Sequence, residues 1–173
     1  KDIGITDRVV YNSLINEART EEFQAVKESK VEAAILLLYQ RGFLGGEARV
    51  DIVNELLGKA AYAGIKKPLI DTYVLDLLSL SIASKTILKL KDSLGFPCGC
   101  GAHNALSTWS FEKRLWVEAE IPCMVAIDSL PVVLGADFII YGPIENCTQV
   151  FPAVYSVDTS YSFLRRMGES IDF

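Results

Sequence analysis

The chain has 173 residues, half of them hydrophobic and 23% charged, which predicts one globular domain spanning residues 1–173 with a substantial core. Its net charge is −5, its pI is near 4.9 and its longest basic groupings are pairs, all of which argues against a nucleic-acid-binding surface. No apolar stretch approaches the roughly 20 residues that cross a bilayer, and there is no signal-peptide pattern. We therefore expect a cytoplasmic protein, either free or peripheral on a membrane complex.

Short apolar stretches alternate with amphipathic ones, which predicts five strand-helix units. We expect Thr20 to cap the first helix, Gly95 to end the third, and the fourth helical stretch to break at Pro122 and Pro131. The predicted elements, in chain order, are a strand at 8–14, a helix at 20–29, a strand at 33–39, a helix at 49–63, a strand at 68–72, a helix at 77–94, a strand at 96–101, a helical stretch at 105–134, a strand at 137–141 and a helix at 150–166.

This alternation indicates an α/β fold with right-handed crossovers. The continuous apolar run at 33–39 is typical of a strand that is buried on both faces, as in parallel sheets. Five units suit a five-stranded doubly wound sheet, and they also suit five-eighths of a (β/α)8 barrel, which typically needs about 250 residues. Neither a P-loop nor a GxGxxG pattern follows the first strand, which weakens the nucleotide-binding form of the doubly wound fold.

Polar residues stand where the predicted strands end: Asn12, Asp71, Asn104 and Glu145. The carboxyl ends of parallel strands open onto one rim, so these residues are expected to converge there. A carboxylate at Asp71 accepts a pair of N–H donors, and the amides of Asn12 and Asn104 both donate and accept, which suits a flat, nitrogen-rich heterocycle. The alternative is structural: Asp and Asn are also common in turns and as helix N-caps.

His103 is the single histidine, and it is either structural or a general acid-base beside Asn104. Thiolates and imidazole are good zinc ligands, which makes Cys98, Cys100 and His103 a conceivable metal site. However, two cysteines separated by a single residue hold their sulfur atoms too close together for a structural zinc site, and no second pair of cysteines supplies the remaining ligands. We therefore predict no metal site and interpret all four cysteines as reduced thiols.

Six segments carry a resemblance to a known family: DRVVYNS, ESKVEAAILL, PLIDTYVLDL, GFPCGCGAHNALSTW, GADFIIYGPIENC and VFPAVYSVDTSY. They are similar to the H subunits of tetrahydromethanopterin S-methyltransferase and related methyltransferases. The resemblance implies a pterin-binding TIM (β/α)8 barrel, of which this chain covers about the last five βα units. The segment VVYNSL then matches the fourth barrel strand, and a family member has about a hundred further residues before it, including an acidic residue that contacts the pterin.

The resemblance also implies an activity: transfer of a methyl group between N5 of a tetrahydropterin and the cobalt of a corrinoid protein. The pterin is methyl-tetrahydromethanopterin or methyl-tetrahydrofolate. Asn12 would bond the pyrimidine ring, Asp71 would accept the ring and amino N–H donors, and Asn104 would bond N5 as the catalytic residue. Glu145 lies on the same rim. The implied partners are a corrinoid protein, other methyltransferase subunits and a second copy of the chain.

Two other functions remain open from the sequence. One is a dihydropteroate-synthase-like enzyme on the same scaffold, although the basic Ser-Arg-type strand end that such an enzyme needs is not found. The other is a non-catalytic pterin-binding or scaffolding subunit.

Overall fold

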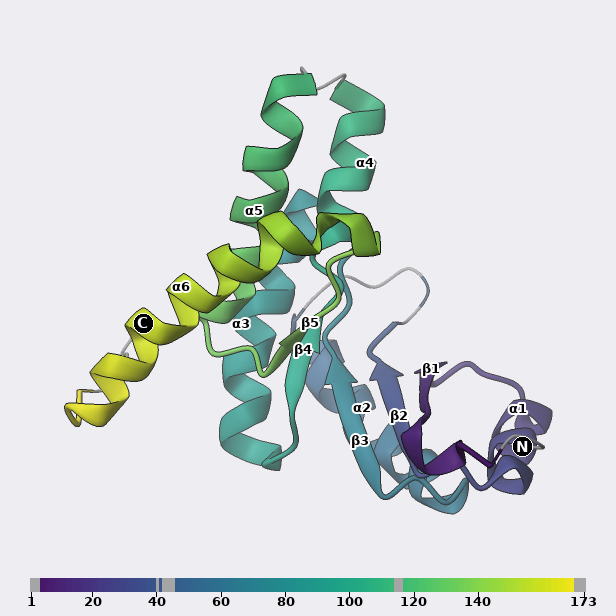
Figure 1. Cartoon of the computed structure of the whole chain (residues 1–173). Helices are drawn as coiled ribbons and strands as arrows, with labels where there is room; N and C mark the ends of the chain where they lie inside the picture. The colour runs from purple at the N-terminus through teal and green to yellow at the C-terminus, as the bar shows by residue number, and fades with distance from the viewer. Residues whose placement is uncertain (1–3, 40, 42–45, 114–116, 170–173) are drawn as a thin grey trace.

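The computed structural model describes residues 4–39, 41, 46–113 and 117–169. It is an α/β fold in which five strands alternate with helices (Figure 1). The strands are β1 (Val10–Leu14), β2 (Ala33–Leu37), β3 (Lys67–Asp71), β4 (Cys98–Cys100) and β5 (Phe138–Ile139). The helices are η1 (Thr6–Arg8), α1 (Thr20–Ser29), α2 (Gly46–Tyr62), α3 (Leu77–Leu94), α4 (His103–Lys113), α5 (Val117–Val133), η2 (Ile144–Asn146) and α6 (Cys147–Arg166).

All neighbouring strands of the sheet are parallel, and each strand pairs with the next one in the chain, in the order β1-β2-β3-β4-β5. A doubly wound sheet needs a point where the strand order reverses, and this sheet has none. That alternative is therefore wrong. A parallel sheet wound in strict chain order agrees with a TIM-like fold.

The two faces of the sheet differ in burial. One row of paired residues, Leu14, Leu36, Ile70 and Cys98, is fully buried against the helices. The opposite face carries residues that are half-buried, such as Leu37, Leu69 and Phe138. The hydrophobic core thus lies between the sheet and its helices, and the other face is covered less completely. The helix residues of this core include Phe23, Val26, Val53, Leu56, Leu80, Ala83, Ile87, Met124 and Ile127.

Local signals explain the helix boundaries that were predicted correctly. Helix α3 begins after a capping box in which Asp76 Oδ1 accepts the Ser79 N–H at 2.7 Å and Ser79 Oγ accepts the Asp76 N–H at 2.8 Å. It ends at Gly95, whose φ of 68° is the left-handed conformation that glycine adopts easily. Helix α1 also has its predicted bounds. However, Thr20 is its first helical residue and Arg19 holds the N-cap position without a side-chain bond.

Other boundaries differ from the prediction. Residues 6–8 form a short 3-10 turn, so the first strand starts only at Val10. The strand β3 has the predicted length but begins and ends one residue earlier, whereas β2, β4 and β5 are shorter than predicted, because apolar residues continue past the paired ladder into the loops. Pro122 and Pro131 both lie inside α5, so the breaks expected at these prolines were wrong. Each proline removes one helix N–H donor, and the packing of α5 against α6 and the sheet holds the helix together.

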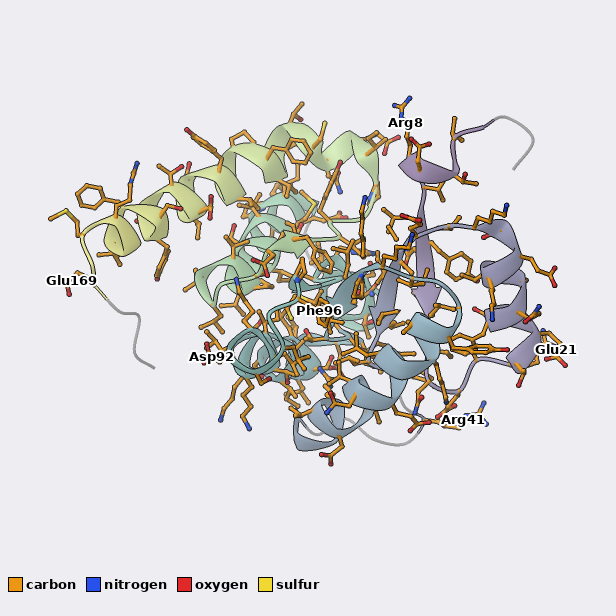
Figure 2. The ribbon with its side chains drawn as sticks, turned by 90° about the horizontal axis from the view of Figure 1, so that it is seen from below. Arg8, Glu21, Arg41, Asp92, Phe96 and Glu169 are labelled. Atoms are coloured by element: carbon orange, nitrogen blue, oxygen red, sulfur yellow. The ribbon has the colours of Figure 1, made fainter. Side chains whose placement is uncertain are left out.

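Helices α4 and α5 stand as a pair beyond the carboxyl ends of the strands (Figure 1). Only Gly101 and Ala102 separate the end of β4 from the start of α4, so the first turn of α4 lies directly on this rim. Helix α6 runs away from the sheet toward Glu169, whereas charged residues such as Arg8 and Glu21 lie at the periphery of the molecule (Figure 2). None of the described helices has both the length and the apolar character that a membrane-spanning helix needs.

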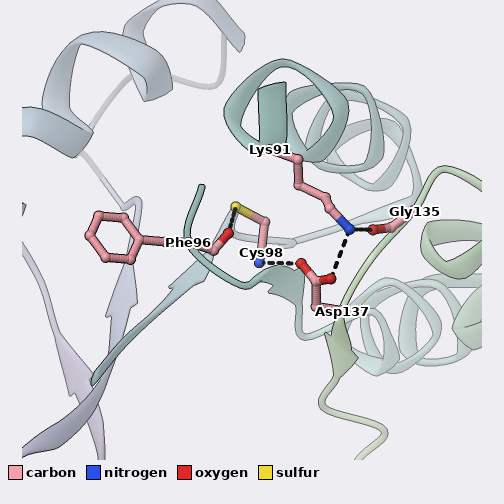
Figure 3. A network of polar contacts seen from close by, with 5 residues as sticks. All are labelled: Lys91, Phe96, Cys98, Gly135 and Asp137. Atoms are coloured by element: carbon pink, nitrogen blue, oxygen red, sulfur yellow. Dashed lines mark hydrogen bonds and ion pairs between the residues drawn. The ribbon is translucent and has the colours of Figure 1, made fainter. Parts of the chain in front are cut away.

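At the opposite end of the sheet, a polar network joins α3, β4 and the start of β5 (Figure 3). Lys91 Nζ donates to Gly135 O at 2.6 Å and pairs with Asp137 Oδ1 at 2.7 Å. The second carboxyl oxygen of Asp137 accepts the Cys98 N–H at 2.9 Å. Farther along the paired strands β4 and β5, the backbone of β5 passes so close to Gly99 that a Cβ on Gly99 would collide with the Phe138 carbonyl oxygen. Only glycine fits at that position.

Candidate functional site

Three side chains converge on Gly101, which follows β4 at the carboxyl rim. An ideal Cβ on Gly101 would lie 3.2 Å from Asn104 Nδ2, 3.7 Å from His103 Cε1 and 3.9 Å from Asp71 Oδ2. Asn104, His103 and Asp71 therefore present an amide, an imidazole and a carboxyl group to the same point of the backbone, where an added Cβ would already crowd the amide. Two residues that the sequence placed in one site, Asp71 and Asn104, do lie together.

Asp71 ends β3 and is 4% exposed. Its Oδ1 accepts the Tyr73 N–H at 2.8 Å, and the Gly101 backbone also bonds the carboxyl group. Burial raises the pKa of Asp71 to about 6, while the two backbone N–H groups and the positive charge of Arg49 pull it down. The group is therefore mainly a carboxylate at pH 7, and it combines the turn role of the structural alternative with a capacity to accept further donors.

Asn104 lies in the first turn of α4, which begins at His103, so it is not the N-cap of the helix. Its Nδ2 donates to Val74 O at 3.2 Å, and one turn later Thr108 Oγ1 donates to Leu75 O at 2.7 Å. These two bonds attach the loop after β3 to α4. No described residue contributes a hydrogen bond to Asn104 Oδ1, which makes this oxygen the acceptor open to a ligand.

The two other predicted residues lie farther from Gly101. Asn12 is exposed in the edge strand β1, where it pairs in register with Ile35, two strands from β3 or about 10 Å across the sheet. Glu145 is exposed in η2, after the end of β5, and no described hydrogen bond or ion pair joins it to Asp71 or Asn104. The structure thus brings Asp71 and Asn104 together and leaves Asn12 and Glu145 at the margin.

His103 is held in one tautomer by the segment after β5. Its Nδ1 lies 2.7 Å from the Ile140 carbonyl oxygen, and a carbonyl can only accept, so Nδ1 carries the proton. The ring also packs against Gly142, where an added Cβ would lie 3.2 Å from Cγ and Cδ2. Nε2 is therefore the nitrogen that is able to exchange a proton.

The cysteines of β4 behave as core side chains. Cys98 and Cys100 are fully buried, and burial is the main cause that raises the pKa of Cys98 to about 11 and that of Cys100 still further. Both thiols are protonated at pH 7, and protonated thiols are poor metal ligands. In the part of the chain that the structure describes, no three His, Cys, Asp or Glu side chains are grouped closely enough to hold a metal ion.

Sequence reasoning missed Arg49. This residue is 2% exposed on α2, and its Nη1 donates to Thr72 O and Tyr73 O at 2.5 and 2.9 Å. Its position at the start of a predicted helix gave no sign of burial, because charged residues are usual there. No local sequence signal marks it, because its burial depends on contacts with the turn after β3.

A groove of about 590 Å³ lies elsewhere, between the edge strand β5 and α6. Apolar side chains such as Phe138, Phe151 and Val154 line it, together with the pair Lys91 and Asp137. None of the four predicted site residues is among its lining. The rim around Gly101 is therefore the candidate site, because it gathers the polar groups that can orient a ligand.

Comparison with known proteins identifies the family of the chain. A family model described as Tetrahydromethanopterin S-methyltransferase MtrH subunit matches residues 1–171. The H subunit of tetrahydromethanopterin S-methyltransferase from Methanothermobacter thermautotrophicus is 35% identical over 173 residues, which cover 91% of this chain and 54% of that protein. The H subunit from Methanosarcina barkeri is 33% identical over 172 residues, with the same two coverages.

The H subunit from Methanopyrus kandleri is 33% identical over 180 residues, covering 91% of this chain and 56% of the relative. The chain therefore spans about half the length of the curated relatives it matches. Since the family model covers nearly every residue, the resemblance seen in the strand-end motifs is confirmed: the chain belongs to the family of tetrahydromethanopterin S-methyltransferase H subunits.

Proposed function

We propose that this chain forms the pterin-binding part of a methyltransferase that moves a methyl group between N5 of a tetrahydropterin and the cobalt of a corrinoid protein. The observation that carries the proposal is that the side chains of Asp71 and Asn104 both converge on Gly101. The names of the relatives favour tetrahydromethanopterin as the pterin. Methyl-tetrahydrofolate is the alternative of the same chemistry.

Asp71 suits the pyrimidine end of a pterin. A carboxylate meets a ring N–H and an exocyclic NH₂ with two parallel bonds, and hydrogen bonds to a charged group are stronger than neutral ones. Its buried position keeps water from competing for these bonds. Asn12 would bond the same ring from the edge strand and Glu145 from beyond β5, and both roles need movement toward Gly101 or a ligand long enough to span the rim.

Asn104 suits the methyl-bearing nitrogen. N5 is a poor leaving group when neutral, because the nitrogen that departs is too basic, and protonation of N5 lowers this barrier. Asn104 Oδ1 accepts a hydrogen bond from the N5–H of the protonated pterin, and this hydrogen bond keeps the proton on N5 during the transfer. The electron pair of the N5–C bond would stay on N5, and the methyl group would pass to the corrinoid of the partner, where cobalt(I) would supply the electron pair of the new bond.

The partner and the rest of the fold follow from the same assignment. Because the methyl acceptor lies on another protein, the rim must stay open to a corrinoid protein, and other methyltransferase subunits are expected beside it. The less completely covered face of the sheet and the unpaired edge of β5 suit closure of the barrel by further βα units. A homodimer and a cytoplasmic place, free or on a membrane complex, stay predictions.

The proposal is tested by two measurements on the purified protein. Calorimetric titration with methyl-tetrahydromethanopterin reports binding, and the decay of the cob(I)alamin absorbance reports methyl transfer when free cob(I)alamin is the acceptor. Binding with transfer supports the proposal. Binding without transfer indicates a pterin-binding subunit that does not catalyse, and absence of binding to both tetrahydropterins rejects the proposal.

A further inference from the structure

Arg49 is buried where a charge is costly to keep. Its side chain is 2% exposed, and Nη1 alone makes both of its described hydrogen bonds, to Thr72 O and Tyr73 O. Nε and Nη2 have no acceptor among the described residues. A buried guanidinium that leaves some of its N–H donors without acceptors destabilises a fold, unless its charge interacts favourably with neighbouring groups. Its neighbours show what that use is.

The backbone carbonyls that Arg49 bonds belong to the turn that presents Asp71. Tyr73 has a φ of 64°, in the left-handed region that non-glycine residues rarely adopt. Its N–H donates to Asp71 Oδ1 and its C=O accepts from Arg49, so the two charged residues hold Tyr73 from its two ends. The guanidinium carbon also lies 5.7 Å from the centre of the Tyr73 ring. The orientation of the Asp71 carboxyl group therefore depends on a turn that Arg49 fixes.

Arg49 also contributes charge to this region. The titratable groups around Asp71 are Tyr39 after β2, Arg49 on α2, Tyr73 after β3, Cys100 on β4 and His103 on α4, and Asp128 on α5 faces Cys100. Burial keeps the Cys100 thiol neutral and raises the pKa of Tyr73, so neither contributes charge at pH 7. Of these described groups, Arg49 is the one with a permanent positive charge, and it attracts the ionised form of Asp71.

We propose that Arg49 is a positioning residue of the pterin site, which fixes the turn at Tyr73, orients the Asp71 carboxyl group toward Gly101 and places a positive charge near it. The inference rests on the proposed function for the identity of the ligand. The relation between Arg49 and Asp71 is independent of the proposed function, because it exists in the free protein. Arg49 touches no reacting atom in this arrangement and acts only through Asp71.

The first experiment measures Asp71 without any ligand. In protein labelled with ¹³C at aspartate carboxyl groups, NMR follows the titration midpoint of Asp71 in the wild type, Arg49→Gln and Arg49→Lys. Loss of the positive charge in Arg49→Gln should move the midpoint upward by about one pH unit, and Arg49→Lys should leave it near the wild-type value. An unchanged midpoint in Arg49→Gln would overturn the proposal.

The second experiment measures affinity for methyl-tetrahydromethanopterin from pH 6 to 9 by calorimetry. Arg49→Gln lacks both the charge and the planar fork, so it should bind more weakly than Arg49→Lys by about twofold at pH 7 and about fivefold at pH 6, and it should match Arg49→Lys at pH 9, where Asp71 is ionised in both variants. An equal loss of affinity in Arg49→Gln and Arg49→Lys at every pH would show that the charge of Arg49 does not act on Asp71. In an Asp71→Asn background the change Arg49→Gln should have little further effect, and an undiminished effect there would also refute action through Asp71.

Lys59→Gln is the matched control, because Lys59 is another cation of α2 whose Nζ donates to a backbone carbonyl, that of Asn16, at 2.8 Å. Lys59→Gln should change neither the titration midpoint of Asp71 nor the pH dependence of the pterin affinity. If Arg49→Gln does not fold, Arg49→Lys carries the test. Lysine keeps the positive charge but lacks the planar guanidinium and its fork of donors. The affinity of Arg49→Lys for the pterin should therefore fall several-fold at every pH, and wild-type affinity in this variant would count against positioning.

The two proposals fail in different ways. If the Asp71 midpoint moves as expected but no tetrahydropterin binds, then Arg49 controls Asp71 and the proposed function is wrong. If the pterin binds the wild type and Arg49→Gln alters neither midpoint nor pH profile, then the proposed function stands and Arg49 has no such role.

Discussion

Asn104 folds back onto Gly101. Its backbone N–H donates to the Gly101 carbonyl oxygen at 3.2 Å, and its Nδ2 lies 3.2 Å from the point where a Cβ on Gly101 would stand. A separation of 3.2 Å is tighter than an ordinary van der Waals contact, so an added methyl group must displace the amide. The position of the Asn104 side chain therefore depends on the absence of a side chain three residues earlier.

Gly101→Ala should weaken pterin binding by roughly tenfold, because overpacking of this kind costs about 1–3 kcal/mol and here it moves the amide of Asn104, which we propose binds the pterin. Calorimetry measures the affinity, and thermal unfolding shows whether the fold is intact. The control is Gly58→Ala on α2, where an added Cβ meets nothing within 4 Å. It should leave affinity unchanged and slightly raise stability, as alanine favours a helix. Equal affinity of Gly101→Ala and wild type would remove Asn104 from the site.

Asn104→Ala should lower the methyl-transfer rate by about 10²-fold, a size typical of removing one transition-state hydrogen bond, and lower affinity less. Single-turnover transfer to cob(I)alamin separates the two effects. Asn104 also anchors the loop after β3, so Thr108→Val serves as a control: it removes the neighbouring anchor to Leu75 O, together with the bond from Thr108 Oγ1 to the Asn104 carbonyl oxygen, and leaves the Asn104 amide in place. A rate loss of the same size in Thr108→Val would mean that loop order, and not the amide at N5, sets the rate.

The affinity for the pterin should depend on the ionisation of Asp71. Burial raises the pKa of this group to about 6, so wild-type binding should weaken as the pH falls through this value and the carboxyl group becomes protonated. Asp71→Asn cannot ionise and should bind about 10- to 100-fold more weakly at pH 7, with little dependence on pH over this range. Titration of both proteins at pH 5 to 8 checks this. Parallel pH profiles would contradict it.

Asp128 should make the fold less stable at high pH. It is fully buried on α5, neither carboxyl oxygen has a hydrogen-bond partner among the described residues, and burial raises its pKa to about 7. An aspartate in an unfolded chain titrates near about 3.9. The folded form thus keeps a proton that the unfolded chain loses. Hence the free energy of unfolding should fall as pH rises from about 4 and level off above about 7.

Asp128→Asn should flatten this dependence, because an amide does not titrate. At pH 8 the variant should be more stable than the wild type by about 1–3 kcal/mol, whereas at pH 4 to 5 the difference should nearly vanish. Urea unfolding at both pH values measures the effect. Asp92→Asn, at an exposed position of α3, is the control and should change neither value. The same pH slope in the wild type and Asp128→Asn would show that Asp128 is ionised in the fold.

The sequence predicted the elements best where local chemistry marks their ends. The bounds of α1 and α3 were correct because acidic residues in the first turn of α1 and Gly95 after α3 act within a few residues. The strand order was not predictable in this way. Alternating units fit both a doubly wound sheet and a sheet in chain order, and only the pairing of distant strands distinguishes them.

The candidate site was predictable in part for the same reason. Parallel strands share a rim, so Asp71 and Asn104 could be placed together from their positions after two neighbouring strands. The burial of Arg49 and Asp128 could not be predicted, because a charged residue on a helix normally faces water, and whether it does so depends on contacts made across the fold. The hydrogen bond from Asn104 to Val74 likewise depends on how the loop after β3 settles on α4.

The two ends of the sheet are built for separate purposes. At the amino end, connections of three or four residues lead into β2, β3, β4 and β5, and the pairs Lys66–Glu32 and Lys91–Asp137 tie them down. The opposite end carries Asp71 and Asn104. Loops at that opposite end can thus be exchanged while the ion pairs at the amino end continue to hold the scaffold. An engineer who wishes to raise thermal tolerance would work on the tied end and leave the chemistry untouched.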